Sequence, residues 1–586
     1  MGRIVRVCVV AAMLSASVAG AGGDSPLTKA VKASDVATVR SLVKSRADVN
    51  LRSGDGSTPL LWAAHNSDIE IARVLIAAGA KVDTPNNFGV TPLLAASRIG
   101  DATMMAALLK AGADPARGLP AGETPLAASA RAGSVDGVKL LIERRIDLNA
   151  ADTVQKTTPL MWAAVEGHTA VVDLLLKAGA DPNRQGHITS LTERTINSDH
   201  PTGGFTALMF AARQGDEATV RRLAAGKADL NLKNGDGATA MMIAIYNDRF
   251  DMAATLLSLG ADANDGSLYV AVEMRESTTD QFAYDGSRLR PDHPNQLSAL
   301  DLMKMLLEKG ADPLKNFSGQ FHSYSMPNSD RFDNSPLFRA AAASDAEALK
   351  VLAAHGTNLD FMPVAAPAAP PAPGAPAAAG RGGRGNPNAG RTAAMVTMTG
   401  GRGPGMTGGP GYIRSGPVPY REPGSRKPED AFAVLLKAGA NPNAKGPDGA
   451  TLLHQAVNAN SVPMIRALAE ANVDFSATNR DGLTALDVAE GKQPANAPAA
   501  AARGARPGGP PPPAVGGGRG GRGGRGGANR EEVVKVLREL MGLPPAPPSA
   551  TPSATPAPGS APASAPAAAP ADPAGAVLGD VAGDAQ

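Results

Sequence analysis

Residues 158–183, which read TPLMWAAVEGHTAVVDLLLKAGADPN, contain the unit from which most of the chain is built. Thr158 is a good helix N-cap and Pro159 suits the first helical position, so a helix is predicted to begin here. Gly167 separates it from a second helix, whose apolar stripe is supplied by valines and leucines. Gly179 lies where a left-handed C-cap is needed, and the Asp-Pro-Asn that follows favours an extended exit. The stretch therefore predicts a helix, a turn, a second helix and an extended segment.

The same pattern recurs along the chain at a nearly constant interval. Four openings followed by Pro-Leu are spaced by 33 residues, and Thr158 comes 34 residues after the last of them: Ser25, Thr58, Thr91 and Thr124. Further openings and the glycines that end second helices continue the series: Thr206, Thr239, Thr451 and Thr484, with Gly79, Gly112, Gly179, Gly260, Gly310 and Gly439. A period of about 33 residues with a TPLxxAA opening and a GADxN exit resembles the ankyrin repeat.

This resemblance implies an all-α solenoid of paired antiparallel helices with β-hairpin fingers, about 11 repeats long, over roughly residues 25–542 with interruptions. Turn signals such as Asn234-Gly235-Asp236-Gly237 lie where the family places its fingers. A stacked array needs no division into globular domains, because each repeat contacts only its neighbours. The aromatic content of 3% fits a core of Ala, Leu and Val, and the net charge of +2 by itself implies no polyanionic partner.

Composition divides the array into segments. We expect ankyrin repeats over residues 25–360, with insertions at 184–205, 277–297 and 316–334, and again over residues 428–492. Pro, Gly, Ala and Arg content predicts three disordered segments: an Ala/Pro- and Gly/Arg-rich insertion at 361–427, a Gly/Arg/Pro-rich insertion at 493–529 and a Pro/Ala-rich tail at 543–586. Residues 530–542, whose predicted outer face is charged, are expected to form the capping helix of the last repeat. Aromatic residues in the earlier insertions are expected to pack on the scaffold or on a partner: Phe282, Tyr284, Phe317, Phe321, Tyr324 and Phe332.

The first 21 residues resemble a secretory signal peptide. Arg3 and Arg6 form a charged start, an apolar run follows, and small residues up to Ala21 supply a cleavage site. The apolar run is too short to span a bilayer, so no transmembrane span is expected after signal cleavage. Cys8, the only cysteine, lies inside this segment, so the mature chain is expected to have no disulfide, thiol nucleophile or cysteine-bound zinc. We expect a periplasmic or extracellular location.

The sequence offers no catalytic constellation. The eight histidines are scattered without metal-ligand spacing, and His168 and His454 match structural positions of the resembled family. The glycine strings at 403–408 and 516–521 fit a dinucleotide fingerprint only in their letters, because neither follows a predicted strand or opens a helix. We therefore expect no enzyme activity, no cofactor, no metal and no small-molecule substrate.

One position of the repeat suggests where a partner could bind. The fourth residue after the opening Thr is Trp62, Trp162 or Phe210 in three repeats. The resemblance implies that this position faces the concave surface, because the next two residues are the alanine pair that packs inward. Large aromatics on an open surface are typical of binding hot spots. The alternative is that each Trp packs on its neighbouring repeats. Polar residues further along the same helices complete the predicted partner-binding set: His65, Asn66, Glu166, Arg213 and Gln214.

Taken together, these features favour a non-catalytic scaffold that binds an unknown partner protein along a concave ankyrin groove outside the cytoplasm. The Arg-Gly strings within 380–424 and 516–527 leave a second hypothesis, a nucleic-acid-associated protein, because such segments pair with phosphates and stack on bases. An export signal argues against nucleic acid, and a flexible linker or a contact with an anionic envelope surface also accounts for these strings. A structural spacer in the envelope, reaching through the Pro/Ala tail, is the third hypothesis.

Overall fold

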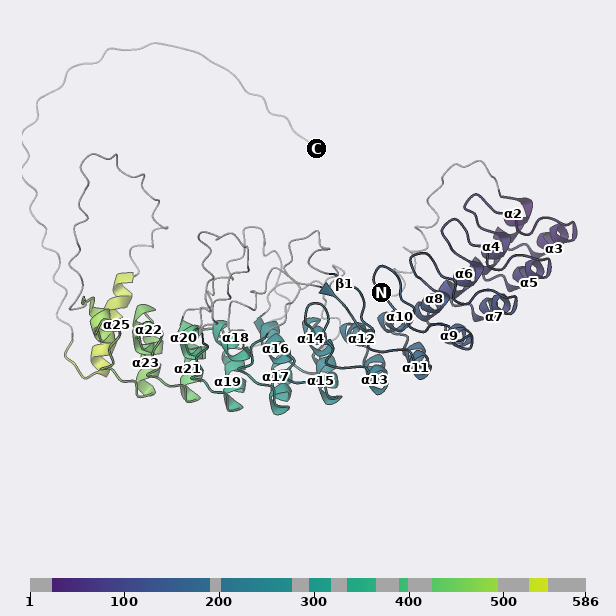
Figure 1. The fold of residues 1–586 in the computed structure, drawn as a ribbon. Coiled ribbons are helices and arrows are strands. Elements are labelled where there is room, and N and C mark those ends of the chain that lie inside the picture. Colours follow the sequence, from purple (N-terminus) through teal and green to yellow (C-terminus); the bar gives the residue numbers. More distant parts are fainter. Residues whose placement is uncertain are drawn as a thin grey trace, which may run out of the picture.

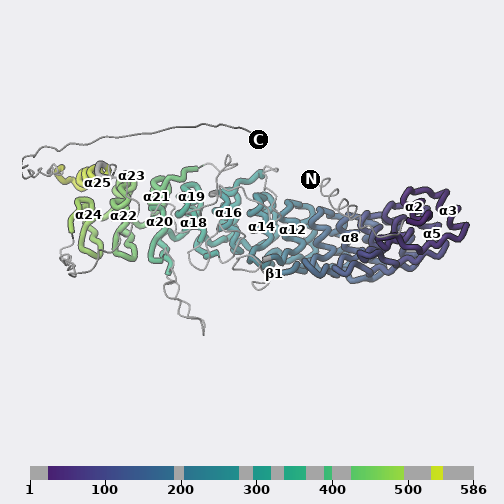
Figure 2. Tube along the Cα trace, turned by 90° about the horizontal axis from the view of Figure 1, so that it is seen from above, coloured from purple at the N-terminus to yellow at the C-terminus, as the bar shows by residue number. Residues whose placement is uncertain are grey.

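The computed structural model describes residues 24–189, 202–276, 295–317, 335–364, 389–398, 424–493 and 526–545. These residues form helix pairs that stack in chain order along an elongated, curved arc (Figure 1). Seen from above, successive pairs follow one another in a single file (Figure 2). No helix in this part of the chain is both long enough and apolar enough to cross a bilayer.

The described residues contain 24 helices, which form twelve antiparallel pairs. Even-numbered helices open each pair and line the concave side of the arc, and we call them the inner helices; odd-numbered helices are the outer helices (Figure 1). The inner helices are α2 (Pro26–Lys32), α4 (Pro59–His65), α6 (Pro92–Ile99), α8 (Pro125–Arg131), α10 (Pro159–Val165), α12 (Ala207–Gln214), α14 (Ala240–Tyr246), α16 (Ser267–Glu276), α18 (Pro336–Ala342), α20 (Ala393–Met398), α22 (Leu452–Asn458) and α24 (Ala485–Glu490).

The outer helices are α3 (Val36–Lys44), α5 (Ile69–Ala77), α7 (Ala102–Lys110), α9 (Val135–Ile142), α11 (Thr169–Lys177), α13 (Glu217–Ala225), α15 (Phe250–Ser258), α17 (Ala299–Glu308), α19 (Ala346–Ala354), α21 (Pro428–Lys437), α23 (Val462–Glu470) and α25 (Gly526–Leu540). The count of twelve pairs exceeds the expected number of about eleven by one. The solenoid fold itself is the one that the sequence predicted.

Local chemistry explains where these helices begin and end. Thr58 and Thr158 cap their inner helices by accepting the N–H of the third helical residue, and a proline follows each at the first position. At the other end of the unit, Gly179 has a φ of +97°, and the next N–H, that of Ala180, donates to the carbonyl of Leu175 at 3.0 Å. This is a Schellman motif, so the predicted left-handed C-cap is confirmed.

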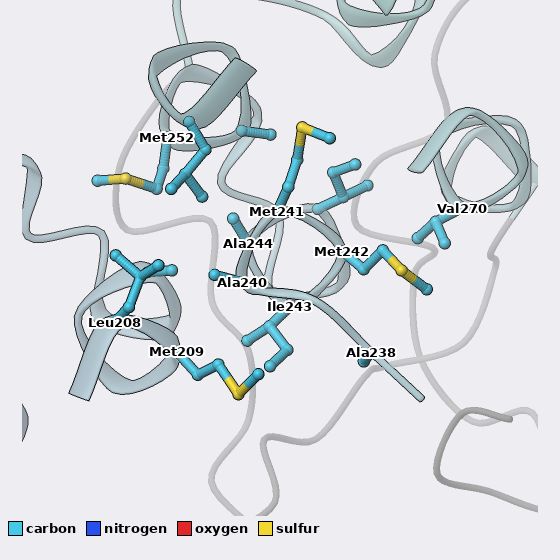
Figure 3. Packing of buried hydrophobic residues seen from close by; sticks show 14 of the residues in the cluster. Leu208, Met209, Ala238, Ala240, Met241, Met242, Ile243, Ala244, Met252 and Val270 are labelled. Atoms are coloured by element: carbon cyan, nitrogen blue, oxygen red, sulfur yellow. The ribbon is translucent and has the colours of Figure 1, made fainter. Parts of the chain in front are cut away.

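The core is a continuous layer of small and medium side chains between the helices. Figure 3 shows inner helix α14 packed by Leu208 and Met209 of α12 and by Val270 of α16. Ala240 and Ala244, both buried, permit the close approach of neighbouring helices. Every inner helix contacts the next inner helix, and every outer helix the next outer helix, from α2 to α25. The pairs therefore align into one stack.

After eight of the twelve outer helices in the described residues, an asparagine or aspartate ties its repeat to the next one. The Asn183 side chain accepts the N–H of Asp229 at 2.7 Å and donates to the carbonyl of Lys227 at 3.3 Å. The same acceptor role recurs at Asn50, Asp83, Asn149, Asn231, Asn264, Asp360 and Asn443. These bonds fix the backbone at the outer edge of the stack at a constant register.

The loops that connect consecutive pairs, which we call fingers, are mostly turns and not the regular hairpins that the resemblance implied. Within the described residues, β1 (Ile188–Thr189) pairs antiparallel with β2 (Thr202–Gly203), and single antiparallel bridges join Lys445 to Thr451 and Thr478 to Thr484 in two later fingers. Phe317 is buried and stacks on Tyr269 of α16 at 5.0 Å. This aromatic residue packs on its own scaffold; Phe282, Tyr284, Phe321, Tyr324 and Phe332 lie outside the described residues, as do residues 1–23 and the Arg-Gly strings.

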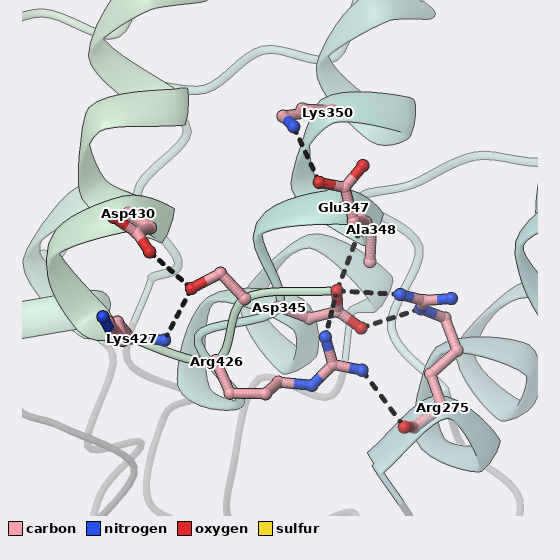
Figure 4. A network of polar contacts seen from close by, with 9 residues as sticks. Arg275, Asp345, Glu347, Ala348, Lys350, Arg426, Lys427 and Asp430 are labelled. Atoms are coloured by element: carbon pink, nitrogen blue, oxygen red, sulfur yellow. Dashed lines mark hydrogen bonds and ion pairs between the residues drawn. The ribbon is translucent and has the colours of Figure 1, made fainter. Parts of the chain in front are cut away.

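A buried ionic cluster joins three repeats. Asp345, the N-cap of α19, accepts two hydrogen bonds from Arg275 of α16 at 2.8 and 3.1 Å and pairs with Arg426 at 2.8 Å (Figure 4). Arg426 also donates to the carbonyl of Arg275 at 3.2 Å, and the N–H of Ala346 donates to the carbonyl of Ser425 at 3.2 Å. The cluster holds the residues that lead into α21 against α16 and α19.

Candidate partner-binding site on the inner helices

The three predicted aromatic side chains occupy equivalent positions on the inner helices. Trp62, Trp162 and Phe210 each lie four residues after the capping Thr, and each backbone N–H donates to the carbonyl of that Thr at 3.2, 3.0 and 3.1 Å. The alanine pair that follows each aromatic residue is fully buried, so the aromatic side chain is turned away from the core. Because α10 contacts α12, Trp162 and Phe210 lie on adjacent repeats, whereas α6 and α8 separate Trp62 from Trp162.

The rings are less open than the sequence suggested, because long cationic side chains of the same chain lie on them. All three aromatic side chains are only partly exposed. Lys32 Nζ lies 4.2 Å from the Trp62 ring centre, and Arg131 Cζ lies 4.6 Å from that of Trp162. A cation on an indole face at such a site contributes about 0.5–1 kcal/mol. Both cations come from the preceding repeat, so each indole ring also takes part in packing between repeats.

Both contacts join the same two positions of consecutive repeats. Lys32 and Arg131 are each the seventh residue after the opening Ser or Thr, and each lies on the fourth-position residue of the next repeat. Sequence reasoning missed both cations, although the repeat spacing places position seven of one inner helix beside position four of the next. The indole N–H of Trp62 is buried with no hydrogen-bond acceptor among the described residues, so this edge of the ring is turned inward.

Phe210 belongs to a second aromatic group. Its ring centre lies 5.3 Å from that of Phe205, and Arg213 Cζ lies 5.5 Å from Phe210 and 5.8 Å from Phe205. Phe205 directly precedes the capping Thr206 and was not predicted as part of the site. A finger residue and an inner-helix residue thus form one partly exposed surface.

Some of the predicted polar residues contact the aromatic groups, and others bond the preceding repeat or face solvent. His65 lies edge-on to Trp62 with ring centres 5.8 Å apart, and Glu166 pairs with Arg131 at 3.6 Å. Asn66 donates to the carbonyl of Val31 in the preceding repeat at 3.4 Å, so it contributes to stacking. Gln214 is exposed at the end of α12. The structure places all eight predicted residues on the inner-helix side, in two groups around Trp62 and around Trp162 and Phe210.

The described residues contain no cluster that could hold a metal ion. No group of three or more His, Cys, Asp or Glu side chains within them is arranged to hold a metal ion. A cavity of about 60 Å³ lies elsewhere, between Asp265, Tyr269 and Phe317. It is far smaller than the roughly 300–1,000 Å³ of ligand pockets. The two histidines assigned structural roles act in that way: His168 bonds the carbonyl of Arg131 at 3.0 Å, and His454 is buried beside Thr451.

Comparison with known proteins identifies the repeats. A family model for ankyrin repeats in three copies matches residues 27–118, 93–186 and 184–267, and a second model for ankyrin repeats in many copies matches residues 435–489. Together the matches cover residues 27–267 and 435–489, which is about half of the chain.

Curated relatives and a solved structure are also similar to part of the chain. The chain is 33% identical over 132 residues to the putative ankyrin repeat protein FPV031 of fowlpox virus, covering 22% of this chain and 35% of the viral protein. It is 33% identical over 128 residues to alpha-latroinsectotoxin-Lt1a of Latrodectus tredecimguttatus, covering 22% of this chain and 8% of the toxin. The match thus spans about a third or less of these relatives. The human ASB11 ankyrin repeat domain superposes with a TM-score of 0.35 at 23% identity, over 40% of this chain and 98% of that domain. With twelve stacked helix pairs and family matches in both halves of the array, the chain belongs to the ankyrin-repeat family.

Proposed function

We propose that this ankyrin-repeat protein is a non-catalytic scaffold that binds a partner protein along its inner helices. Ankyrin repeats generally mediate protein–protein interaction. The observation that carries the proposal is the line of partly exposed aromatic rings at one repeat position, with cations already held on two of them. Rings fixed in this way lose little side-chain freedom on binding, so the surface is largely preformed.

We further propose that this binding takes place outside the cytoplasm. The signal-like residues 1–21 support this location. N-terminal sequencing of the protein recovered from the periplasm or medium tests it: the mature chain is expected to begin after Ala19 or Ala21. A cytoplasmic protein with an intact first residue would contradict the proposal.

The double substitution Trp162→Ala and Phe210→Ala tests the binding surface. The intact chain is used as bait in an envelope extract of the producing organism, and the captured proteins are compared. We expect the double variant to lose its specific partner while keeping nearly the same thermal unfolding, because both side chains are only partly buried.

The matched control is Leu176→Ala, which removes a partly buried side chain from outer helix α11. It is expected to lower the melting temperature at least as much as the double variant and to retain capture. Equal capture by wild type and the double variant would contradict the proposal. A large loss of melting temperature in the double variant would show that the two rings are packing residues.

A further inference from the structure

The five fingers that connect the first six repeats carry half of the exposed apolar side chains. We number them in chain order, and their described residues are 51–57, 84–90, 117–123, 150–157 and 184–189 with 202–205. Eight large hydrophobic residues stand exposed in the described part of the chain, and four of them lie in fingers 1, 2, 4 and 5: Leu51, Phe88, Val154 and Ile188. Phe88 is 69% exposed and Val154 63%, values that are unusual for apolar side chains of their size. Such a series indicates an interaction surface.

Backbone contacts hold these fingers in one row. The N–H groups of Asn87, Thr153 and His187 each donate to a backbone carbonyl of the preceding finger, at 3.0, 2.9 and 2.7 Å. Fingers 2 and 3 meet at Gly89, where an added Cβ would lie 3.0 Å from Pro120. The exposed apolar side chains therefore project from a connected and preformed scaffold.

The exposed charged side chains of the same fingers are all basic. Among the described residues of the five fingers they are Arg52, Arg117, Lys156 and Arg184. The three carboxylates of these segments are half-buried and are bound by groups of the same chain. Asp55 and Asp152 accept backbone N–H groups of their own fingers, and Glu123 pairs with Arg98. The charges that reach solvent most freely in this row are therefore positive.

Two of the four cations are available to an outside partner. The side chains of Arg117 and Lys156 make no hydrogen bond or ion pair with any other described residue. Arg52 instead donates to carbonyls of both finger 1 and finger 2, at 2.8 and 2.9 Å. Arg184 lies 3.9 Å from the carboxylate of Asp181. We therefore expect Arg117 and Lys156 to make the charge contacts.

The separation of the apolar side chains selects the occupant. Phe88 and Val154 are two fingers apart, or roughly 16–20 Å if fingers follow the spacing of the repeats. Each is flanked in sequence by polar residues or glycine. A stable protein interface needs a contiguous, well-packed apolar centre, which separate side chains do not supply. The interfacial region of a bilayer is fluid, so it accepts each apolar side chain separately.

Nucleic acid fits the row less well than a lipid surface. Single-stranded nucleic acid is bound by stacking of its bases on aromatic rings. Of the four exposed apolar residues only Phe88 has a ring, and Leu51, Val154 and Ile188 are aliphatic. Apolar side chains accompanied by exposed cations are instead typical of proteins that bind anionic membrane surfaces.

We infer that fingers 1–5 dock the protein on an anionic lipid bilayer, with Phe88 and Val154 inserted at the headgroup boundary and Arg117 and Lys156 against lipid phosphates. Apolar side chains at such a surface enter about 5–10 Å deep. Each Lys or Arg close to an anionic leaflet strengthens binding about fivefold. This inference goes beyond the proposed function, because Trp162 and Phe210 lie on the inner helices and take no part in the lipid contact.

The test measures co-sedimentation of the full chain with vesicles made of equal parts phosphatidylglycerol and phosphatidylcholine, at low and high salt. We expect saturable binding that salt weakens. Phe88→Ser plus Val154→Ser should weaken it at least tenfold, because both apolar anchors are lost. Arg117→Gln plus Lys156→Gln should weaken it at least fivefold and reduce the effect of salt.

Control variants remove matched side chains elsewhere. Ile99→Ser removes a 48% exposed apolar residue at the end of inner helix α6. Lys44→Gln plus Lys110→Gln removes two exposed cations from outer helices α3 and α7. Each control should change vesicle binding less than twofold. Vesicles of phosphatidylcholine alone should bind the wild-type chain at least fivefold more weakly.

A fluorescent label measures insertion directly. Cys8 is the only cysteine, so Val154→Cys and Ile99→Cys, each made together with Cys8→Ser, give chains with a single labelling site. With an environment-sensitive dye attached, the label at position 154 should brighten and shift to the blue when anionic vesicles are added. The label at position 99 should not change.

Several results would overturn the inference: no vesicle binding, an equal loss in the control variants, or an equal dye response at positions 154 and 99. Capture of a protein from a lipid-free envelope extract that depends on Phe88 and Val154, without vesicle binding, would assign the row to a protein partner instead. The Trp162 and Phe210 double variant should still bind vesicles. Failure of the lipid test therefore leaves the proposed function standing.

Discussion

At the scale of single residues, the C-terminal turn of the outer helix gives the clearest test of the local rules. Gly179 has a φ of +97° and open space around it, so conformation and not crowding requires glycine. Arg46 occupies the equivalent position after α3 with a φ of +60°, and the same pair of hydrogen bonds closes the turn. A non-glycine residue in this conformation costs about 1–2 kcal/mol, partly offset by the unfolded-state entropy of glycine.

We therefore predict opposite effects at these two positions. Arg46→Gly is expected to stabilise the fold by about 0.5–1 kcal/mol, and Gly179→Ala to destabilise it by about 1 kcal/mol. Urea unfolding of the two variants measures both values. Arg40→Ala, on the exposed side of the same outer helix, is a control that should change little. Effects of the same sign at both positions would show that side-chain contacts, and not backbone conformation, decide these turns.

At the scale of elements, the cluster around Asp345 should dominate the stability of its three repeats. Its side chain is fully buried between two arginines, and removing one charge from a buried pair typically costs about 3–5 kcal/mol. Asp345→Asn keeps the size and the capping capacity of the side chain, so it isolates the charge. We expect a loss of that order in denaturant unfolding, together with faster hydrogen exchange in α16, α19 and α21.

The control for this prediction is Glu347→Gln, two residues further along. Glu347 pairs with Lys350 on the surface, where such a pair contributes about 0.5 kcal/mol or less. If the two variants unfold at the same denaturant concentration, the buried cluster does not stabilise the stack as the geometry indicates.

The last inner helix carries a pH-dependent cap. Hydrogen bonds from Lys492 and Thr484 hold the pKa of Asp487 down to about 2, below its ordinary value of 3.8. A carboxyl whose folded pKa is lowered stabilises the fold above its unfolded pKa and loses this effect as pH falls toward the folded pKa. We therefore expect α24 to lose protection between about pH 4 and pH 2. Hydrogen exchange of a peptide spanning α24 measures the change, and Asp487→Asn should abolish this part of the pH dependence.

The elements show why some features were predictable and others were not. Caps such as Thr158 and turns such as Gly179 depend on a few adjacent residues, and their positions were correct because local chemistry decides them. The pairing of Arg275 with Asp345 joins residues 70 apart, and Arg426 joins Arg275 over 151 residues, so no periodic rule indicates these contacts. The aromatic residues at position four were identified from the repeat spacing, but the cations that lie on two of them were not, because these side chains come from the preceding repeat.

At the scale of the whole molecule, the stacked arrangement predicts that removing one repeat destabilises mainly the repeats next to it. Apart from contacts such as the hydrogen bond from Arg426 to the carbonyl of Arg275, each helix pair packs on its immediate neighbours, so stability is approximately a sum of local terms. Ending the chain after residue 493 removes α25, whose buried Val533, Val536 and Leu537 cover α23 and α24. We expect faster hydrogen exchange in α22, α23 and α24, with unchanged protection in α2 to α13.

A chain ending after residue 545 keeps α25 and serves as the control for this truncation. It should exchange like the full-length protein throughout the array. A uniform loss of protection from α2 onward in the shorter chain would mean that the array unfolds as one cooperative body and not as a series of coupled repeats.

The anchoring of Ser425 and Arg426 has a practical consequence for the architecture. Because these two residues are fastened directly to Ala346 and Asp345, the polypeptide resumes its path at a point set by the preceding repeat. The spacing between one helix pair and the next therefore does not depend on how many residues connect 398 to 424. A fluorescent protein or an enzyme grafted at this junction would be carried as cargo at a fixed site along the arc, leaving the surface over the first six repeats clear.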